Sequence, residues 1–359
     1  MGELLIRYLP PVAAWLLVLV WRSQDDAIRR LWLGLAVSLT VLTPAGQSAV
    51  AAVTGEHDFV RLLGHAGMVL VAWSAHDFLA HLNGLRRSRW SKWWTAGMFA
   101  VMCVLFALKP NLLPQSPWVF EYWVAYLLTL TPAFGNVIRL GLRFARATSD
   151  RALRVGLHLI VSGTALALVY LVNRVVRVGA GRFDYQYRLG YQFWVSAVAP
   201  NAAHALVLLG AAIPAVAAWR RRYRQYTQLR PLWQLLAAAE PSIALNPRVG
   251  WWNMRLRVYR RVIEIRDGLL DLQPYRDADV AGAARERAAG PAEVEAAVIA
   301  AAIEARAGGV EPARTEPVAG GPDLASDTAF LCEVAEEMAS VGGFSRQAKC
   351  RTVAESPDS

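Results

Sequence analysis

The sequence predicts an all-α membrane protein in which transmembrane helices precede a small helical cytoplasmic domain. Three observations support this fold class. The 359-residue chain is 55% hydrophobic and 18% charged, a composition typical of membrane proteins rather than of large soluble domains. Its apolar residues gather into runs long enough to cross a bilayer. Its charges also separate: residues 1–275 carry 30 Lys and Arg against 13 Asp and Glu, whereas residues 276–359 carry 8 against 15.

Seven apolar runs are expected to form a transmembrane domain over residues 1–222. They extend over residues 4–21, 31–53, 59–80, 93–108, 118–144, 153–178 and 193–219. Most contain the roughly 20 residues that a helix needs to cross the ~30 Å hydrocarbon core. The segment Trp-Arg-Ser-Gln-Asp-Asp after the first run offers no small-residue cleavage site. The first run is therefore expected to remain as a span and not to be removed as a signal peptide.

Basic residues set the expected orientation of these spans. They gather after the first, third, fifth and seventh runs, and the positive-inside rule places such loops in the cytoplasm. The chain is then a multi-pass protein of the cytoplasmic (plasma) membrane, with its N-terminus outside and its C-terminus in the cytoplasm. The outer loop after the sixth run disagrees, because it holds Arg174, Arg177, Arg182 and Arg188. Either these arginines reach toward the membrane interface, or they form a vestibule that gathers anions or contacts lipid headgroups.

The sequence also indicates which partners and chemistries to expect. The positive charge beside apolar spans is assigned to the lipid bilayer with its anionic lipids, so no direct binding of nucleic acid is expected. Cys103, Cys332 and Cys350 form no Cys-x-x-Cys pair, which argues against a zinc ribbon or a disulfide framework. The chain contains no glycine-rich phosphate loop, His-Glu-x-x-His or Gly-x-Ser-x-Gly motif. No enzymatic activity, catalytic residue, metal site or cofactor is therefore expected.

Ionisable and amide side chains inside the predicted spans are the candidate functional residues, because such groups are costly in a bilayer. They are His65, His76, Asp77, Asn136, Arg139, His158, Asn173, Arg174, Asn201 and His204. His65 and His204 are expected toward the outer side, and His76 and His158 toward the inner side. Three hypotheses remain open: hydrogen bonds between helices, a path for protons or a substrate, and b-type haem groups, each held by the two histidines of one layer.

A helix over residues 253–275 is expected to organise a cytoplasmic domain over residues 223–343. Five aliphatic side chains spaced by four, three, four and three residues share one of its faces. We call them the core stripe: Val258, Val262, Ile265, Leu269 and Leu272. The opposite face carries the charged residues Arg257, Arg260, Arg261, Glu264, Asp267 and Asp271. The core stripe is expected to pack against Phe330, Val334 and Met338 of the last helix.

The remaining parts of this domain are predicted from composition. An alanine-rich helix over residues 291–307 is expected to lie beside the core stripe. Residues 308–323 are rich in glycine and proline and are expected to form a flexible loop. The last helix, residues 324–341, is expected to end at Gly342 and Gly343, and residues 344–359 are expected to be disordered.

Two stretches, Tyr226–Ala239 and Tyr259–Leu270, resemble a family of actinobacterial membrane proteins, as does the arrangement of seven spans before a helical tail. Members of that family are labelled as transporters with a cytoplasmic C-terminal domain of unknown function. The resemblance therefore implies a transporter-like protein whose substrate is unidentified. The alternative is a membrane sensor or regulator whose cytoplasmic domain binds a soluble regulatory protein. A b-type haem membrane protein is a minor alternative.

Overall fold

The chain is all-α, as predicted. The computed structural model describes residues 2–20, 26–41, 43–55, 58–85, 89–109, 113, 116–183, 185, 195–196, 198–243, 250, 253–287 and 289–354. Within these ranges the regular structure consists of helices, and an isolated antiparallel bridge joins Asp277 to Thr315. The chain divides into two compact units, Met1–Val216 and Ala217–Ser359, which we call the N-terminal and C-terminal units. Arg188, one of the loop arginines named above, lies outside the described residues.

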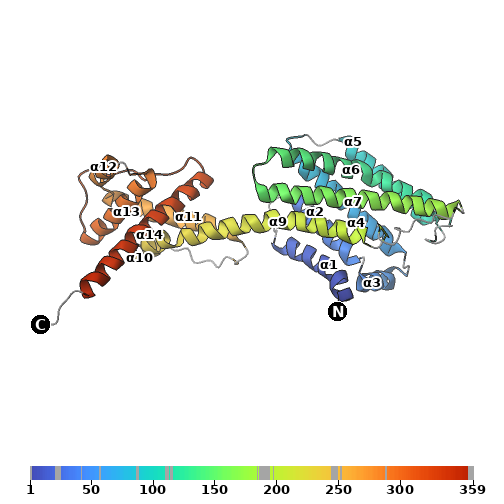
Figure 1. Ribbon diagram of the computed structural model, residues 1–359, viewed down its shortest axis with the longest axis horizontal. Coiled ribbons are helices and arrows are strands. Elements are labelled where there is room, and N and C mark those ends of the chain that lie inside the picture. The colour runs from blue at the N-terminus through green and yellow to red at the C-terminus, as the bar shows by residue number, and fades with distance from the viewer. Residues whose placement is uncertain are drawn as a thin grey trace. The chain divides into compact units, whose positions relative to one another are not determined.

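The N-terminal unit is a bundle of helices (Figure 1). Its helices are α1 (Gly2–Val20), α2 (Asp26–Val41), α3 (Pro44–Thr54), α4 (Phe59–Leu82), α5 (Arg89–Leu108), α6 (Val119–Ala147), α7 (Arg151–Arg182) and the first part of α9 (Ala199–Gln228). α4 packs against α2, α5 and α6, and α6 packs against α5 and α7. These two helices therefore contribute to most of the helix–helix contacts of the unit.

Three described helices are long and apolar enough to cross a membrane: Trp90–Leu108, Arg151–Arg182 and Ala199–Ala239. α2 and α3 are bent by 82° relative to each other and together make a fourth candidate if they form one bent span. The sequence explains why α3 begins as a separate helix. Pro44 occupies its first turn, and the Thr43 side chain accepts a hydrogen bond from Gly46 N at 3.1 Å, which caps the helix. These helices show that the chain is a membrane protein.

α4 and α6 are not among these three helices, although the sequence predicted them as spans. α4 buries ten of its residues, including Ser74 and Asp77, and α6 buries Tyr122 and Thr129 among others. By contrast, only 6% of the apolar window of α5 is buried inside the protein. A helix enclosed by other helices can carry polar groups that a helix facing lipid cannot. The enclosed positions of α4 and α6 therefore account for the polar side chains that they bury.

Glycine residues allow the helices of the N-terminal unit to approach closely. A Cβ atom added to Gly156 of α7 would lie 2.3 Å from the carbonyl oxygen of Gly210 in α9. A Cβ atom added to Gly210 would lie 2.6 Å from the carbonyl oxygen of Gly156. α2 and α4 also meet at small residues, because the Ser38 hydroxyl donates to the Gly64 carbonyl at 3.0 Å. Such contacts are typical of helices that associate within lipid.

The C-terminal unit surrounds the core stripe of α11. It contains the end of α9, α10 (Arg230–Ala239), η1 (Pro241–Ile243), α11 (Met254–Asp271), η2 (Gln273–Tyr275), α12 (Ala278–Glu286), α13 (Pro291–Gly308) and α14 (Leu324–Ala354). All five residues of the core stripe are buried. They share one cluster with Leu232 of α10, Ile299 of α13 and Val334 of α14. Phe330 and Met338 are partly buried and pack against this cluster. Figure 1 shows these helices gathered together.

α14 differs from the helix that the sequence predicted. It extends from Leu324 to Ala354, so it passes through Gly342 and Gly343, and residues 344–354 are helical where disorder was expected. A glycine inside a helix costs about 1 kcal/mol relative to alanine, which weakens a helix without necessarily ending it. Residues 355–359 lie outside the described residues.

Candidate functional site

His65 of α4 lies in a group of aromatic side chains from α6, which we call the aromatic box: Tyr122, Trp123 and Tyr126. His65 Nδ1 is 2.6 Å from the Tyr122 hydroxyl. Its ring stacks on Tyr126 with a centroid distance of 4.1 Å and meets Trp123 edge-on at 5.1 Å. All three aromatic residues are buried. His65 therefore makes the kind of hydrogen bond between helices that the first of the three hypotheses describes.

Two cations lie next to the aromatic box. The guanidinium of Arg174 in α7 is 4.9 Å from the centroid of the Trp123 ring, a favourable position over the face of an indole. Lys109, which follows α5, lies 3.9 Å from the centroid of Phe106 and 3.3 Å from a carboxylate oxygen of Asp58. The box and these cations join α4, α5, α6 and α7. Arg174 therefore contacts protein rather than forming an open outer vestibule.

Several polar atoms near the aromatic box are buried and have no hydrogen-bond partner among the described residues. They are Glu121 Oε2, Asn173 Nδ2 and Arg174 Nε. Buried polar atoms almost always have a partner, which can be water or a ligand. These atoms are therefore the best candidates for binding a small polar species within the N-terminal unit. Sequence reasoning named Asn173 and Arg174 but missed Glu121 and the aromatic box. The recurrence of Tyr122, Trp123 and Tyr126 on one helical face was the available signal.

The other candidates within the predicted spans have different environments. His204 Nδ1 is 2.7 Å from the Pro200 carbonyl oxygen within α9, and its Nε2 is buried without a hydrogen-bond partner in the described chain. His76 is half-buried near the charges of Asp77 and Arg139. Asn136 is half-buried, whereas His158 and Asn201 are exposed on the surface of the unit. No group of three or more His, Cys, Asp or Glu placed to hold a metal occurs in the described ranges. The haem hypothesis stays a prediction.

The charged face of α11 is not uniformly exposed. Arg261 and Glu264 are only 9% and 7% exposed. Arg261 lies over the rings of Tyr226 and Trp233 at 4.0 and 4.5 Å, and its Nη2 donates to the Tyr226 hydroxyl at 3.0 Å. Trp233 Nε1 donates to Glu264 at 2.8 Å. Burial lowers the pKa of Arg261. Arg260 and Glu264, which are four residues apart on α11, form an ion pair at 3.6 Å.

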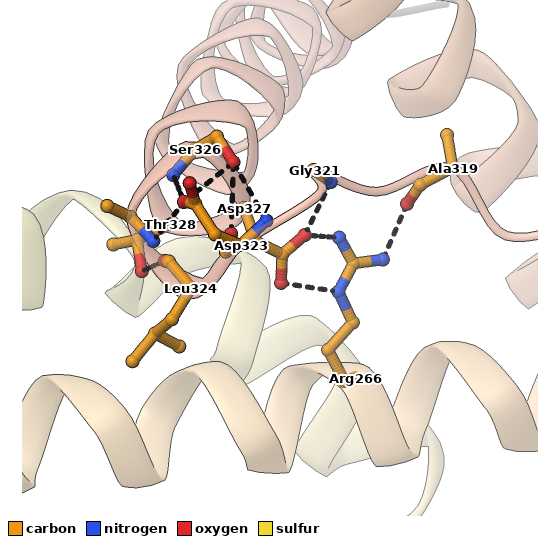
Figure 2. A network of polar contacts seen from close by, with 9 residues as sticks. Arg266, Ala319, Gly321, Asp323, Leu324, Ser326, Asp327 and Thr328 are labelled. Carbon is orange, nitrogen blue, oxygen red and sulfur yellow. Dashed lines mark hydrogen bonds and ion pairs between the residues drawn. The ribbon is translucent and has the colours of Figure 1, made fainter.

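Arg266 of α11 holds the segment that precedes α14 (Figure 2). Its Nε donates to Asp327 Oδ2 at 3.0 Å, its Nη2 donates to the other carboxylate oxygen, and its Nη1 donates to the Ala319 carbonyl. Gly321 N also donates to Asp327, at 3.1 Å. Asp323 caps the start of α14 by accepting hydrogen bonds from two backbone N–H groups. One arginine thus fixes both the segment and the helix that follows it.

Arg276 holds the same segment at a second place. Its side chain is fully buried, and its Nη2 lies 2.8 Å from Glu295 Oε2. Its Nε donates to the Glu316 carbonyl at 3.0 Å, and its Nη2 donates to the Pro317 carbonyl at 3.1 Å. Residues 308–323, which the sequence predicted as a flexible loop, are therefore fixed to the helices through their backbone. We call this segment the strap.

α11 also carries a second apolar face, which points away from the core. We call it the outer stripe: Leu256, Tyr259, Ile263 and Leu270. The exposed fractions of Leu256, Tyr259 and Leu270 are 40%, 44% and 59%. Their spacings of three, four and seven residues place them on one side of the helix. Sequence reasoning missed this stripe, because the charged residues between its members concealed the period.

The comparisons with known proteins concern the C-terminal unit. Residues 218–340 match a family of unknown function (DUF6545). The matched residues include Tyr226–Ala239 and Tyr259–Leu270, the two stretches that carry the resemblance noted from the sequence. They also contain the core stripe, the strap and the arginines that hold it. No curated protein and no solved structure matches the chain.

Proposed function

We propose that the protein is a membrane-anchored regulator. The N-terminal unit holds the chain in the cytoplasmic membrane, and the C-terminal unit binds a soluble protein through the outer stripe. The observation that carries this proposal is the exposure of Leu256, Tyr259 and Leu270 on a helix whose other face already belongs to a complete core. Apolar side chains gathered on one exposed face of a domain mark an interaction surface.

The proposal includes seven membrane crossings, with the N-terminus outside and the C-terminal unit in the cytoplasm. The crossings are α1, the pair α2 and α3, α4, α5, α6, α7 and α9. The enclosed positions of α4 and α6 support counting them as spans despite their polar residues. The basic residues in the last part of α9, Arg220, Arg221, Arg222 and Arg224, support a cytoplasmic C-terminal unit.

The charges around the outer stripe indicate which charges the surface of the partner should carry. Asp267 is exposed and lies within the stripe, between Ile263 and Leu270. Arg255 is exposed at the start of α11, and its charge lies near that of Arg222. An apolar partner surface with a cation opposite Asp267 and an anion opposite Arg255 is complementary to this face. An amphipathic helix can present all three features in one line.

Site-specific photo-crosslinking in native membranes tests the proposal. A benzoylphenylalanine placed at Leu270 should crosslink to one soluble protein, and Asp267→Lys in the same chain should reduce the yield at least fivefold. The matched control places the probe at Glu286, an exposed residue of α12, where no crosslink to that protein is expected. If the Leu270 probe reacts only with lipid or with the chain's own membrane helices, the outer stripe is not a partner site.

Transport is a second candidate, favoured by the buried polar atoms beside the aromatic box. Glu121, Asn173 and Arg174 each offer an atom without a hydrogen-bond partner in the described chain. A proton or a small polar substrate that passes near His65 would meet these atoms. Proteoliposomes that contain the pH-sensitive dye pyranine test this candidate. A proton flux that His65→Phe abolishes and His158→Phe preserves would favour transport, whereas no flux above empty liposomes would count against a proton path.

A further inference from the structure

An apolar groove lies between α4 and α5, within the N-terminal unit. Its volume is about 330 Å³. The lining residues that matter here are Leu70 and Trp73 of α4 and Lys92, Thr95, Ala96 and Phe99 of α5. On α5 these residues recur every three or four positions, so they occupy one face of the helix. Leu70, Lys92 and Ala96 are exposed, so the groove is reached from the surface of the unit.

The packing of the two helices explains why the groove exists. Trp94 Nε1 of α5 donates to the Leu128 carbonyl of α6 at 3.2 Å, and Met102 and Phe106 of α5 join the buried cluster of α6. α4 is held on another side by Ser38 of α2, which donates to its Gly64 carbonyl. α5 is therefore fixed to α6, whereas α4 is fixed to α2 as well as to α6. The small side chain of Ala96 leaves the space between them unfilled.

One end of the groove has the character of a membrane interface. Lys92 lies one turn from the start of α5, and the neighbouring Trp90 and Trp93 are exposed. Tryptophan and lysine are the side chains that anchor helices at the level of the lipid headgroups. Phe99 lies seven residues farther along α5, about 10 Å deeper at 1.5 Å per residue. The groove therefore runs from a cationic rim at headgroup level into the apolar part of the unit.

We propose that this groove binds an anionic phospholipid, with one acyl chain between α4 and α5 and the phosphate paired with Lys92. Thr95, one turn below Lys92, supplies a hydroxyl donor for a phosphate or ester oxygen. The cation at the rim favours an anionic headgroup over a zwitterionic one, whose own cation it would repel.

Native mass spectrometry of the full-length protein in mild detergent tests the proposal. Dioleoyl phosphatidylglycerol and dioleoyl phosphatidylcholine are added in competition. One phosphatidylglycerol should bind in preference to phosphatidylcholine, and Lys92→Gln should reduce that preference about fivefold, the factor that corresponds to ~1 kcal/mol for one lysine near an anionic surface. If Lys92→Gln retains the full preference, Lys92 does not hold the phosphate and the proposal fails.

A pair of tryptophan substitutions tests the place of the acyl chain. Ala96→Trp fills the groove and should remove the bound lipid. Gly97→Trp adds the same side chain one residue away, where a Cβ atom meets nothing within 4 Å, and should leave binding unchanged. Equal loss in both variants, or retention in Ala96→Trp, would overturn the assignment.

A dimer that dissociates in Ala96→Trp, with lipid binding unaltered, would show that a second copy occupies the groove instead. If Ala96→Trp does not fold, Thr95→Val provides the test of the upper groove, with a reduced affinity for phosphatidylglycerol expected.

Discussion

The two units of this protein bury different kinds of residue where their helices meet. In the N-terminal unit, Gly156 and Gly210 bring the backbones of α7 and α9 together. In the C-terminal unit, Ile265, Leu269 and their neighbours fill a core of aliphatic side chains. In lipid, the burial of apolar side chains between helices provides no hydrophobic driving force. Close backbone approach and hydrogen bonds therefore hold membrane helices together. In water, the burial of each aliphatic side chain stabilises the folded state by roughly 1.5–3 kcal/mol. One chain thus follows two packing rules, each suited to the surroundings of its unit.

Cations lie over aromatic rings in both units, as Arg174 and Arg261 do, but the arginines that hold the strap belong to the C-terminal unit. His65 and Arg174 in the N-terminal unit contact aromatic rings. Arg266 and Arg276 in the C-terminal unit bind carboxylates and backbone carbonyls. The stability of the N-terminal unit therefore depends mainly on the close approach of helix backbones, whereas that of the C-terminal unit depends mainly on apolar burial and on paired charges.

The largest effect is expected from a charge placed in the aliphatic core. Ile265→Asp should lower the free energy of unfolding of the C-terminal unit by more than ~3 kcal/mol, because it buries an unpaired charge. Limited proteolysis of membranes that carry the variant should digest the C-terminal unit while the membrane helices remain inserted. Leu270→Asp is the matched control, since Leu270 is exposed, and should resist protease. An Ile265→Asp variant as resistant as the unsubstituted protein would show that this core is not formed.

The next effect concerns the buried ion pair of Arg276 and Glu295. Arg276→Ala leaves the Glu295 carboxylate buried without its partner, at an expected cost of about 3 kcal/mol. The double substitution Arg276→Met with Glu295→Leu removes both charges and should recover most of that loss. Pulse proteolysis in urea measures the midpoint for the C-terminal unit. If the double variant is as unstable as Arg276→Ala, the hydrogen bonds from Arg276 to the strap matter more than its ion pair.

A moderate effect is expected from a side chain placed between α7 and α9. Gly210→Leu should destabilise the N-terminal unit by about 1–3 kcal/mol, the usual cost of overpacking, because its Cβ atom would lie 2.6 Å from a backbone oxygen. Gly135→Leu in α6 is the control, since a Cβ atom there meets nothing within 4 Å. Thermal unfolding in detergent measures both. Equal melting temperatures for the two variants would contradict the close contact of α7 with α9.

The smallest effect is expected at the surface contact of Glu240 with Arg306. Hydrogen bonds from Ser242 and Arg306 hold the pKa of Glu240 below 4.5. A carboxylate whose pKa is lower in the folded state contributes stability above its unfolded pKa and loses it as pH falls through the folded pKa. Glu240→Gln should therefore lower the urea midpoint slightly at pH 7, and this difference should disappear once the pH has fallen through the lowered pKa of Glu240. If the urea midpoints of Glu240→Gln and the unsubstituted protein still differ at low pH, the effect does not come from the titration of Glu240.

Local patterns predicted much of this fold, because helix periodicity depends on neighbours in sequence. The spacing of Val258, Val262, Ile265, Leu269 and Leu272 specified their shared face, and the structure buries that face. Hydrophobic runs also placed α5, α7 and α9 in the membrane. Both inferences need only distances along one helix.

What the sequence did not reveal depends on residues far apart in the chain. The spacing along α11 places Arg261 on the charged face of the helix, yet Tyr226, 35 residues earlier, covers it. His65 was a candidate from its position in a span, but its partner Tyr122 lies 57 residues away. The strap looked flexible from its glycines and prolines, because composition cannot show that Arg276 fixes its carbonyl groups. Tertiary partners, rather than local preferences, decided each of these cases.

The contacts of the strap determine which changes it tolerates. Arg266 and Arg276 bind the carbonyl oxygens of Glu316, Pro317 and Ala319, which every amino acid supplies. Replacing those residues leaves the acceptors in place, whereas inserting or deleting one would move them away from both arginines. The strap is therefore strict in length but permissive in composition at Pro317 and Ala319, so related chains should vary at those two positions by substitution and rarely by insertion.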